Sequence, residues 1–150
     1  MTYPQPPVIQ TILEHAVPVQ VDNSKPENNR FLASIHHIWT PDIRVVDHNG
    51  FEMYRWDGFL PPPEFMARAL CGFAHALLRG KRFDKAEAIY ADVLRRFSTS
   101  YAAPEAQYYL GVTRYRRNPH GDDLLTQWAN LRSRYPHSEY RVKQSYKELP

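Results

Sequence analysis

The chain has 150 residues and a formal net charge of +3, and 43% of its residues are apolar and 13% aromatic. A chain of this length buries about 68–70% of its unfolded surface, as one domain or two small units, and its apolar content excludes a disordered class. The longest apolar run is too short to span a bilayer, and the N-terminus is neither a signal peptide nor a basic targeting helix. We therefore expect a folded cytoplasmic protein.

The chain contains one cysteine, Cys71, which excludes an intramolecular disulfide and a CxxC pair. Because Cys71 lies in an apolar stretch, we expect a buried thiol that packs like a small hydrophobic side chain. A reactive thiol would need exposure and nearby positive charge, for which Arg68 and His75 are the candidates. The histidines show no metal-ligand spacing. No catalytic residue, metal or cofactor is predicted.

Charge is distributed unevenly along the chain. Residues 1–60 carry four basic and seven acidic side chains, a net charge of −3, whereas residues 61–150 carry a net charge of +6. The basic half interleaves arginine with tyrosine, a mixture that can hold phosphates and stack bases. Its arginines fall at ordinary solvent-facing spacings, however, and Tyr115 and Tyr135 fit core positions. Nucleic acid is therefore disfavoured as a partner, and an acidic partner is compatible with the charge.

The first 40 residues alternate between helical and strand patterns. After Pro6 and Pro7, helical spacing predicts a first helix, with Val8, Ile9, Ile12, Leu13 and Ala16 on one stripe. Val17, Val19 and Val21 alternate with polar residues or proline, which predicts a strand over residues 17–22. Pro26 and Glu27 suit the first turn of a second helix, whose apolar residues are Phe31, Leu32, Ile35 and Ile38.

A β-hairpin follows. Two β-rich runs, 42–47 and 51–58, flank the dipeptide Asn49-Gly50, which is the strongest short hairpin signal because a type I′ turn needs positive φ at both positions. Pro41 stands where the first strand begins, a position that tolerates the missing N–H. Gly58 and the prolines 61–63 end the second strand and start the next helix.

Taken together, residues 1–62 resemble the later two-thirds of a thioredoxin fold. The run Val19–Asp22 is similar to that family's strand ending in Asp, Trp39-Thr40-Pro41 to its cis-proline loop, Asp47–Gly50 to its hairpin turn, and Gly58–Pro62 to the start of its last helix. The resemblance implies a cis Thr40–Pro41 bond. In the family this loop meets the substrate backbone, so Trp39, Thr40 and Pro41 are the candidate binding residues. Here the loop either lines a peptide groove or persists as architecture.

The chain departs from the family at the redox centre. The resemblance places a CxxC at the start of the first helix, after a central strand, and both are missing here. Dithiol exchange needs an attacking and a resolving thiol, which this chain does not supply. The missing strand would lie between residues 17–22 and 42–47. We expect a rearranged three-stranded sheet, a homodimer that fills the gap, or a start codon placed too late.

Beyond Pro61 the apolar period becomes helical. The first helix of this region has a broad apolar face formed by Phe65, Met66, Ala69, Leu70, Phe73, Ala74, Leu77 and Leu78. Gly80 is expected to cap it in a left-handed conformation. Further helices are predicted from Phe83 to Phe97, from Pro104 to Tyr115, from Asp122 to Tyr135 with Leu124, Leu125, Trp128 and Leu131 inward, and from Ser138 to Leu149.

These helices resemble tetratricopeptide repeats. The resemblance is carried by Gly80, Phe83, Ala86 and Tyr90, by Ala103–Ala106, by Tyr109, Gly111 and Tyr115, and by Trp128 and Pro136. Small residues such as Ala86 and Gly111 let paired helices approach closely. The whole chain is similar to bacterial thioredoxin-like proteins that carry such a helical tail, and the repeats imply a protein or peptide partner.

The sequence therefore predicts an α+β fold. A truncated thioredoxin-like α/β unit with three strands and two to three helices spans residues 1–62, and an α-helical tetratricopeptide-like region spans residues 63–150. The predicted function is a non-catalytic protein-interaction module. The alternative is a thiol-disulfide oxidoreductase-related protein whose CxxC segment is missing from this chain, or one that relies on Cys71.

Overall fold

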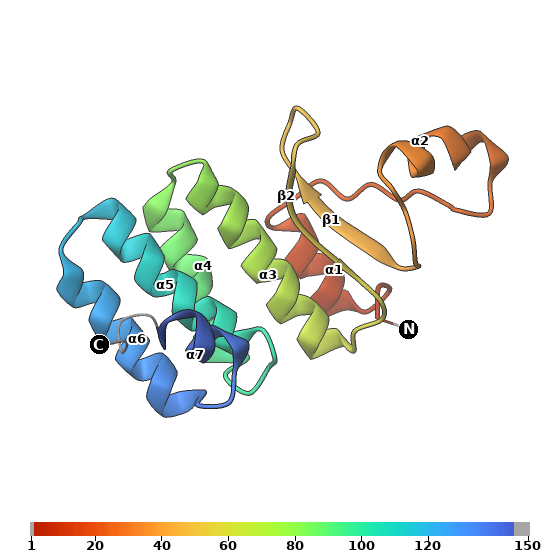
Figure 1. The fold of residues 1–150 in the computed structure, drawn as a ribbon. Helices are drawn as coiled ribbons and strands as arrows, with labels where there is room; N and C mark the ends of the chain where they lie inside the picture. The colour runs from red at the N-terminus through yellow and green to blue at the C-terminus, as the bar shows by residue number, and fades with distance from the viewer. Residues whose placement is uncertain (1, 146–150) are drawn as a thin grey trace.

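A computed structural model describes residues 2–145 of the chain. The elements are α1 (Pro6–Leu13), the 3₁₀-helix η1 (Pro26–Asn28), α2 (Asn29–Ser34), β1 (Asp42–Val46), β2 (Glu52–Asp57), α3 (Pro62–Arg79), α4 (Phe83–Arg96), α5 (Ala103–Arg117), α6 (Gly121–Arg134) and α7 (Glu139–Lys143). The helices α3 to α6 follow one another side by side, and the hairpin crosses α3 (Figure 1). The fold is α+β, mostly helical, with one two-stranded antiparallel sheet.

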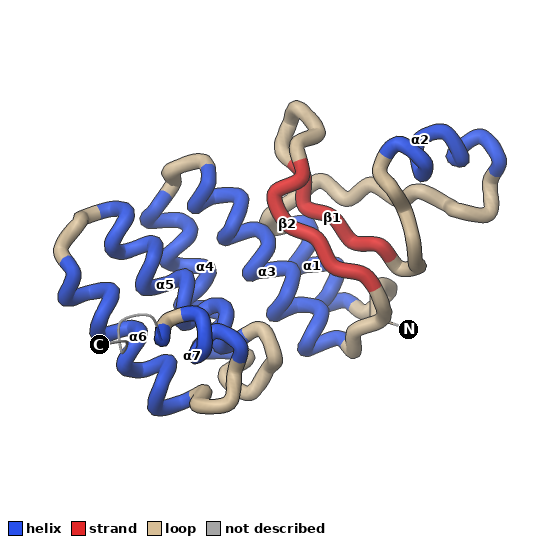
Figure 2. Tube along the Cα trace, in the orientation of Figure 1, coloured by secondary structure: helices blue, strands red, loops and turns tan. Residues whose placement is uncertain are grey.

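The expected three-stranded sheet is wrong for the described residues. Only β1 and β2 pair, and residues 17–22 have no strand assignment (Figure 2). Val17 and Val19 are 89% and 83% exposed. An alternating pattern favours a strand only where a neighbour pairs its backbone and covers its apolar face, and no neighbouring strand lies beside this segment.

The predicted second helix is shorter than its apolar spacing suggested. After η1, α2 ends at Ser34, and His36 has a positive φ of 51° that turns the chain away. Ile38 therefore lies outside the helix and is exposed, as is Phe31 within it. Among helices and strands, α2 contacts η1 alone. It stands off the rest of the fold in Figure 1, so residues 17–41 form an arm.

The hairpin is present, but its turn is not type I′. Of the two central residues only Gly50 has positive φ (80°), and the Asp47 N–H donates to the Phe51 carbonyl across a three-residue loop. The carboxylate of Asp47 accepts the backbone N–H groups of Asn49 and Phe51 at 2.8 and 2.9 Å. This side-chain turn stabilises the longer loop and lets Asn49 avoid the left-handed region.

The helices beyond Pro61 are confirmed within the described residues. Pro62 begins α3 as a first-turn proline. The expected glycine cap is displaced by one residue: Gly80 has φ −75°, and Lys81 instead takes the left-handed conformation at φ 58°. The Arg82 N–H then donates to the Leu77 carbonyl at 2.8 Å, the six-residue bond of a Schellman motif.

Two side chains expected inward are exposed, Leu125 on α6 and Tyr115 on α5. Helix α5 lies between α4 and α6, and α6 packs on α5 and α7, so each side chain lies on a part of its helix that these neighbours leave uncovered. The last predicted helix is found as α7, and the remainder of that prediction, beyond residue 145, lies outside the described residues.

One core joins the hairpin to the helices. Val8 of α1 and Trp56 of β2 are buried in the same cluster as the apolar face of α3 and the inner residues of α4 and α5. Gly72 lets the hairpin approach α3: a Cβ there would lie 2.9 Å from Cδ1 of Tyr54. Gly111 does the same for α6, 3.1 Å from Cβ of Gln127, as the repeat-like pattern predicted. The division at residues 62 and 63 remains a prediction.

Candidate functional site

The predicted binding residues lie at the base of the arm. The Thr40–Pro41 bond is cis, as the resemblance implied. The Pro41 carbonyl accepts the Gly58 N–H at 2.9 Å, which fixes the loop to the end of β2. Thr40 accepts a hydrogen bond from the amide of Asn23 at 2.8 Å. Trp39 is 66% exposed, so its indole projects into solvent and the three residues do not enclose a groove by themselves.

A polar network on the outer face of the hairpin holds the arm. Arg44 contacts both carboxylate oxygens of Asp42 at 2.8–2.9 Å, Glu52 at 2.8 Å and the Ile35 carbonyl at 2.7 Å. His37 lies 3.4 Å from Asp42. The hydrogen bonds from Arg44 lower the pKa of Asp42 below its ordinary value. The arm is therefore attached to β1 at a charged contact instead of an apolar one.

One edge of the sheet has no partner in the described part of the chain. The Pro41 carbonyl and the Asp47 N–H both bond across to the second strand, so in an antiparallel ladder the alternate residues Asp42, Arg44 and Val46 turn their backbone groups to the opposite edge. Residues 17–21 form no hydrogen bond in the structure as described. Two extended segments thus leave their backbone groups to water.

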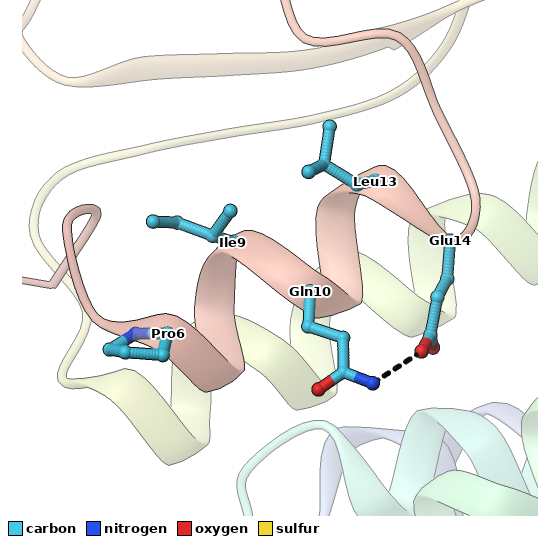
Figure 3. A pocket seen from close by; sticks show the side chains of 5 residues that line it. All are labelled: Pro6, Ile9, Gln10, Leu13 and Glu14. Atoms are coloured by element: carbon cyan, nitrogen blue, oxygen red, sulfur yellow. Dashed lines mark hydrogen bonds between the residues drawn. The ribbon is translucent and has the colours of Figure 1, made fainter.

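Helix α1 presents an apolar surface beside this edge. A hollow on this helix is lined by Pro6, Ile9, Gln10, Leu13 and Glu14, and Ile9 and Leu13 project from one side of it (Figure 3). Gln10 and Glu14 turn to the other side, where Gln10 Nε2 donates to Glu14 Oε1 at 2.8 Å. Helix α1 packs on α3 and contacts neither strand. The two-stranded sheet is therefore too narrow to cover it.

A buried polar cluster lies under the hairpin. The Tyr54 hydroxyl donates to Oε2 of Glu105 at 2.8 Å, and Glu105 is 3% exposed. Burial raises the pKa of Glu105, although the bonds from Tyr54 and Tyr140 oppose the rise. The guanidinium of Arg68 lies 5.9 Å from the centre of the Tyr54 ring, and its buried Nε makes no hydrogen bond.

Sequence reasoning missed this cluster. Glu105 was noted only as part of the repeat-like pattern, and Tyr54 only as a strand residue. The available signal was Glu105 in the first turn of a helix, next to the small or apolar residues Ala103, Pro104 and Ala106, because a buried carboxyl there needs a donor from another element. Which element supplies that donor depends on packing between segments 51 residues apart.

The thiol is buried, as predicted. Cys71 has no exposed surface, and its sulfur lies 3.7 Å from the Ala102 carbonyl. Burial raises its pKa well above the ordinary value, with the charge of Glu105 as a smaller cause and Arg68 opposing. His75, one turn further along α3, bonds to the Tyr90 hydroxyl at 3.2 Å. Burial lowers the pKa of His75 to about 4, so it is neutral at pH 7. Thiolate chemistry is disfavoured in this arrangement.

The remaining candidates for chemistry are few in the described residues. No group of three or more His, Cys, Asp or Glu side chains is placed to hold a metal ion within them. Their helices are also too short or too polar for any to cross a membrane. No family model matches the chain, and comparison with curated proteins and with solved structures finds no significant match.

Proposed function

We propose that this protein is a non-catalytic interaction module that binds a protein or peptide through residues 2–59. The observation that carries the proposal is the distribution of exposed apolar residues. Of the 16 large exposed hydrophobic side chains among the described residues, 12 lie in residues 2–59 and four in residues 60–145. Exposed apolar side chains that gather on one part of a molecule mark interaction sites more often than scattered ones.

The helical region supports this role by supplying a rigid platform. Its helices bury most of the core, and the hairpin is fixed to it by Tyr54, Glu105 and the close approach at Gly72. The arm is fixed in turn by Arg44 and by the cis-proline loop. Trp39, Thr40 and Pro41 belong to this proposed surface, with Trp39 as its exposed aromatic anchor, a residue type that dominates many binding interfaces.

The thioredoxin-like and tetratricopeptide-like ancestry belongs to the same proposal. It is supported by the cis Thr40–Pro41 bond, by the succession of helix, extended segment, helix, hairpin and helix, and by the paired antiparallel helices that follow. On this proposal the chain descends from a thioredoxin-like redox fold, and its cis-proline loop and hairpin now serve binding. The protein would act in the cytoplasm.

The experiment is selection of binders from a random peptide library displayed on phage, with the full chain immobilised. We expect enriched peptides whose affinity falls at least about tenfold in Trp39→Ala, the loss expected of a binding anchor. Tyr101→Ala is the matched control, because Tyr101 is an exposed aromatic on the helical half, with 89% exposure against 66% for Trp39. Failure to enrich any peptide, or equal losses in both variants, would contradict the proposal.

The rival function is thiol-disulfide exchange, and a second assay separates it. Reduction of insulin by dithiothreitol should proceed at the same rate with and without the chain, because Cys71 is buried and has no resolving thiol. Catalysed reduction that disappears in Cys71→Ser would establish the oxidoreductase reading instead.

A further inference from the structure

The geometry points to one mode of binding for the proposed module: an extended peptide strand adds to the free edge of β1 and lies over α1. This inference rests on the proposed function and specifies its partner. The occupant is a peptide segment with apolar side chains at every second position and basic residues at its ends. Three features of the described residues carry it.

The first feature is the position of the free edge over the helices. Strand β2 lies over α3, and its Tyr54 reaches Glu105 on α5. Strand β1 lies on the other side of β2, away from α5 and on the side of α1, as Figure 1 shows. The backbone groups of Asp42, Arg44 and Val46 therefore face the space above α1. A strand added there would lie about 4.8 Å from β1.

The second feature is the surface such a strand would cover. Strands bury one face against helices, and here Ile43 and Val45 provide that face in β1. An added strand continues the face, so its alternate side chains would meet Ile9 and Leu13 of α1, which line the hollow in Figure 3. Apolar residues at alternate positions would cover Ile9 and Leu13, which are exposed here. The added strand would convert a sheet that covers one helix into a sheet that covers two.

The third feature is unused hydrogen-bonding capacity on the far side. Residues 17–21 run in the opposite direction along the chain from β1, and the bond between Asn23 and Thr40 holds the two segments together at one end. The backbone groups of residues 17–21 form no hydrogen bond in the structure as described, so they too are available to a bound peptide. Strand addition at an exposed edge is an established mode of peptide recognition.

The acidic surroundings favour basic residues at the two ends of the bound peptide. Residues 1–60 carry a net charge of −3. Exposed Glu14 lines the hollow at the end of α1, and Asp22 ends the extended segment. Lysine or arginine at the ends of the added strand would complement these carboxylates. A second copy of the chain is a poorer occupant, because its own alternating segment ends in Asp22, whose charge has the same sign as that of Glu14.

The probe is the heptapeptide Lys-Val-Thr-Ile-Thr-Val-Lys, acetylated, amidated and fluorescently labelled, titrated into the full chain and followed by anisotropy. We expect saturable binding, with slower hydrogen exchange of the amides in residues 17–21 and 42–46. Two analogues carry N-methyl groups on the Val and Ile residues or on the Thr residues. At least one should bind about tenfold more weakly or worse, because each removes the donors of one edge.

The matched variants are Leu13→Lys and Leu125→Lys. Both leucines are exposed, at 60% and 47%, so neither substitution empties the core. Leu13→Lys should weaken the probe at least about tenfold, and Leu125→Lys should leave its affinity unchanged. Equal effects of the two variants, equal affinity of both N-methyl analogues and the parent, or no binding would overturn strand addition.

These results separate the inference from the proposed function. Library peptides that need Trp39 but are insensitive to N-methylation would overturn strand addition and leave the interaction module standing. A dimer in sedimentation that protects residues 42–46 without any peptide would assign the edge to a second copy, which also overturns the proposal.

Discussion

The hydroxyl of Tyr54 on β2 donates to Glu105 Oε2 on α5 at 2.8 Å, across 51 residues of sequence. This bond attaches the hairpin to α5, a helix whose backbone lies close to neither strand. It also supplies a donor to a carboxyl that burial would otherwise leave poorly solvated. Together with the packing of both strands on α3, it fixes the hairpin to the helices.

Replacing the donor tests this attachment. Tyr54→Phe keeps the ring and removes the hydroxyl, so Glu105 loses a partner while remaining buried. We expect a loss of about 1–3 kcal/mol in the free energy of unfolding, measured by urea denaturation. Tyr101→Phe, at an exposed site, should change stability by less than about 0.5 kcal/mol. An unaltered midpoint for Tyr54→Phe would mean that the bond contributes nothing.

The close approach of the hairpin to α3 gives a second prediction. In Gly72→Ala the new Cβ would lie 2.9 Å from Cδ1 of Tyr54 and 3.0 Å from Cγ2 of Val45. Because the Tyr54 ring is held by its bond to Glu105, we expect a destabilisation of about 1–3 kcal/mol from overpacking, in spite of the better helix propensity of alanine.

Gly80→Ala is the control for that substitution. Its Cβ would meet the Ala76 carbonyl at 3.4 Å, an ordinary contact, and Gly80 has negative φ. Urea denaturation should show little change for Gly80→Ala. A neutral or stabilising Gly72→Ala would show that the hairpin does not pack as described.

His75 predicts a pH dependence of stability. Burial lowers its pKa to about 4 from 6.5, so the unfolded chain binds more protons between these values and stability falls as the pH drops from about 6.5 to about 4. The expected loss is on the order of 2 kcal/mol. Glu105 has a raised pKa and gives the opposite slope, with stability falling as the pH rises above 4.5.

His75→Gln isolates the histidine contribution, because glutamine can still bond to the Tyr90 hydroxyl but does not titrate. Glu105 is present in both proteins, so the difference between their stability–pH curves measures His75. We expect that difference to grow between pH 6.5 and pH 4, with the variant losing less. Parallel curves in urea denaturation at several pH values would contradict the assignment.

We expect the thiol of Cys71 to be unreactive in the folded state. Its side chain is fully buried and burial raises its pKa, so an aromatic disulfide reagent should react only as the chain unfolds. In urea one thiol should react promptly, which serves as the control. Full labelling of the native protein within seconds would contradict the burial of Cys71 and would again favour a function in thiol chemistry.

Replacing Arg44 should loosen the arm locally. Arg44→Lys can still pair with Asp42 but cannot also bridge Glu52 and the Ile35 carbonyl, since lysine lacks the planar fork. We expect faster amide hydrogen exchange over residues 29–37 with little change in global unfolding, because α2 contributes no buried residue. Arg30→Lys, on exposed α2, is the control. Unchanged exchange in Arg44→Lys would show that the arm is held by other contacts.

Much of the helical half could be predicted from the sequence. The apolar spacing of α3 and α4, the first-turn Pro62 and the breaks near residues 98–100 and 118–121 specify helices through local physics, and these helices then pack on their sequence neighbours. The burial of Cys71 followed from the same spacing. The cis Thr40–Pro41 bond was anticipated only through the resemblance.

The first third shows why the rest could not be predicted. The alternation of Val17, Val19 and Val21 is a true strand pattern, yet a strand exists only when another segment pairs with it, and the sequence of one segment does not contain that information. The same holds for the Asn49-Gly50 turn, where the Asp47 side chain selected a different geometry.

By itself, then, the sequence determined where helices and hairpin form, because helical periodicity and turn chemistry act over a few residues. Only the tertiary structure decided that the sheet stops at two strands, that Tyr54 meets Glu105, and that Ile9 and Leu13 stay uncovered beside a free edge. Those features depend on contacts between distant segments, whose energies are settled jointly by packing, burial and the pairing of backbone groups.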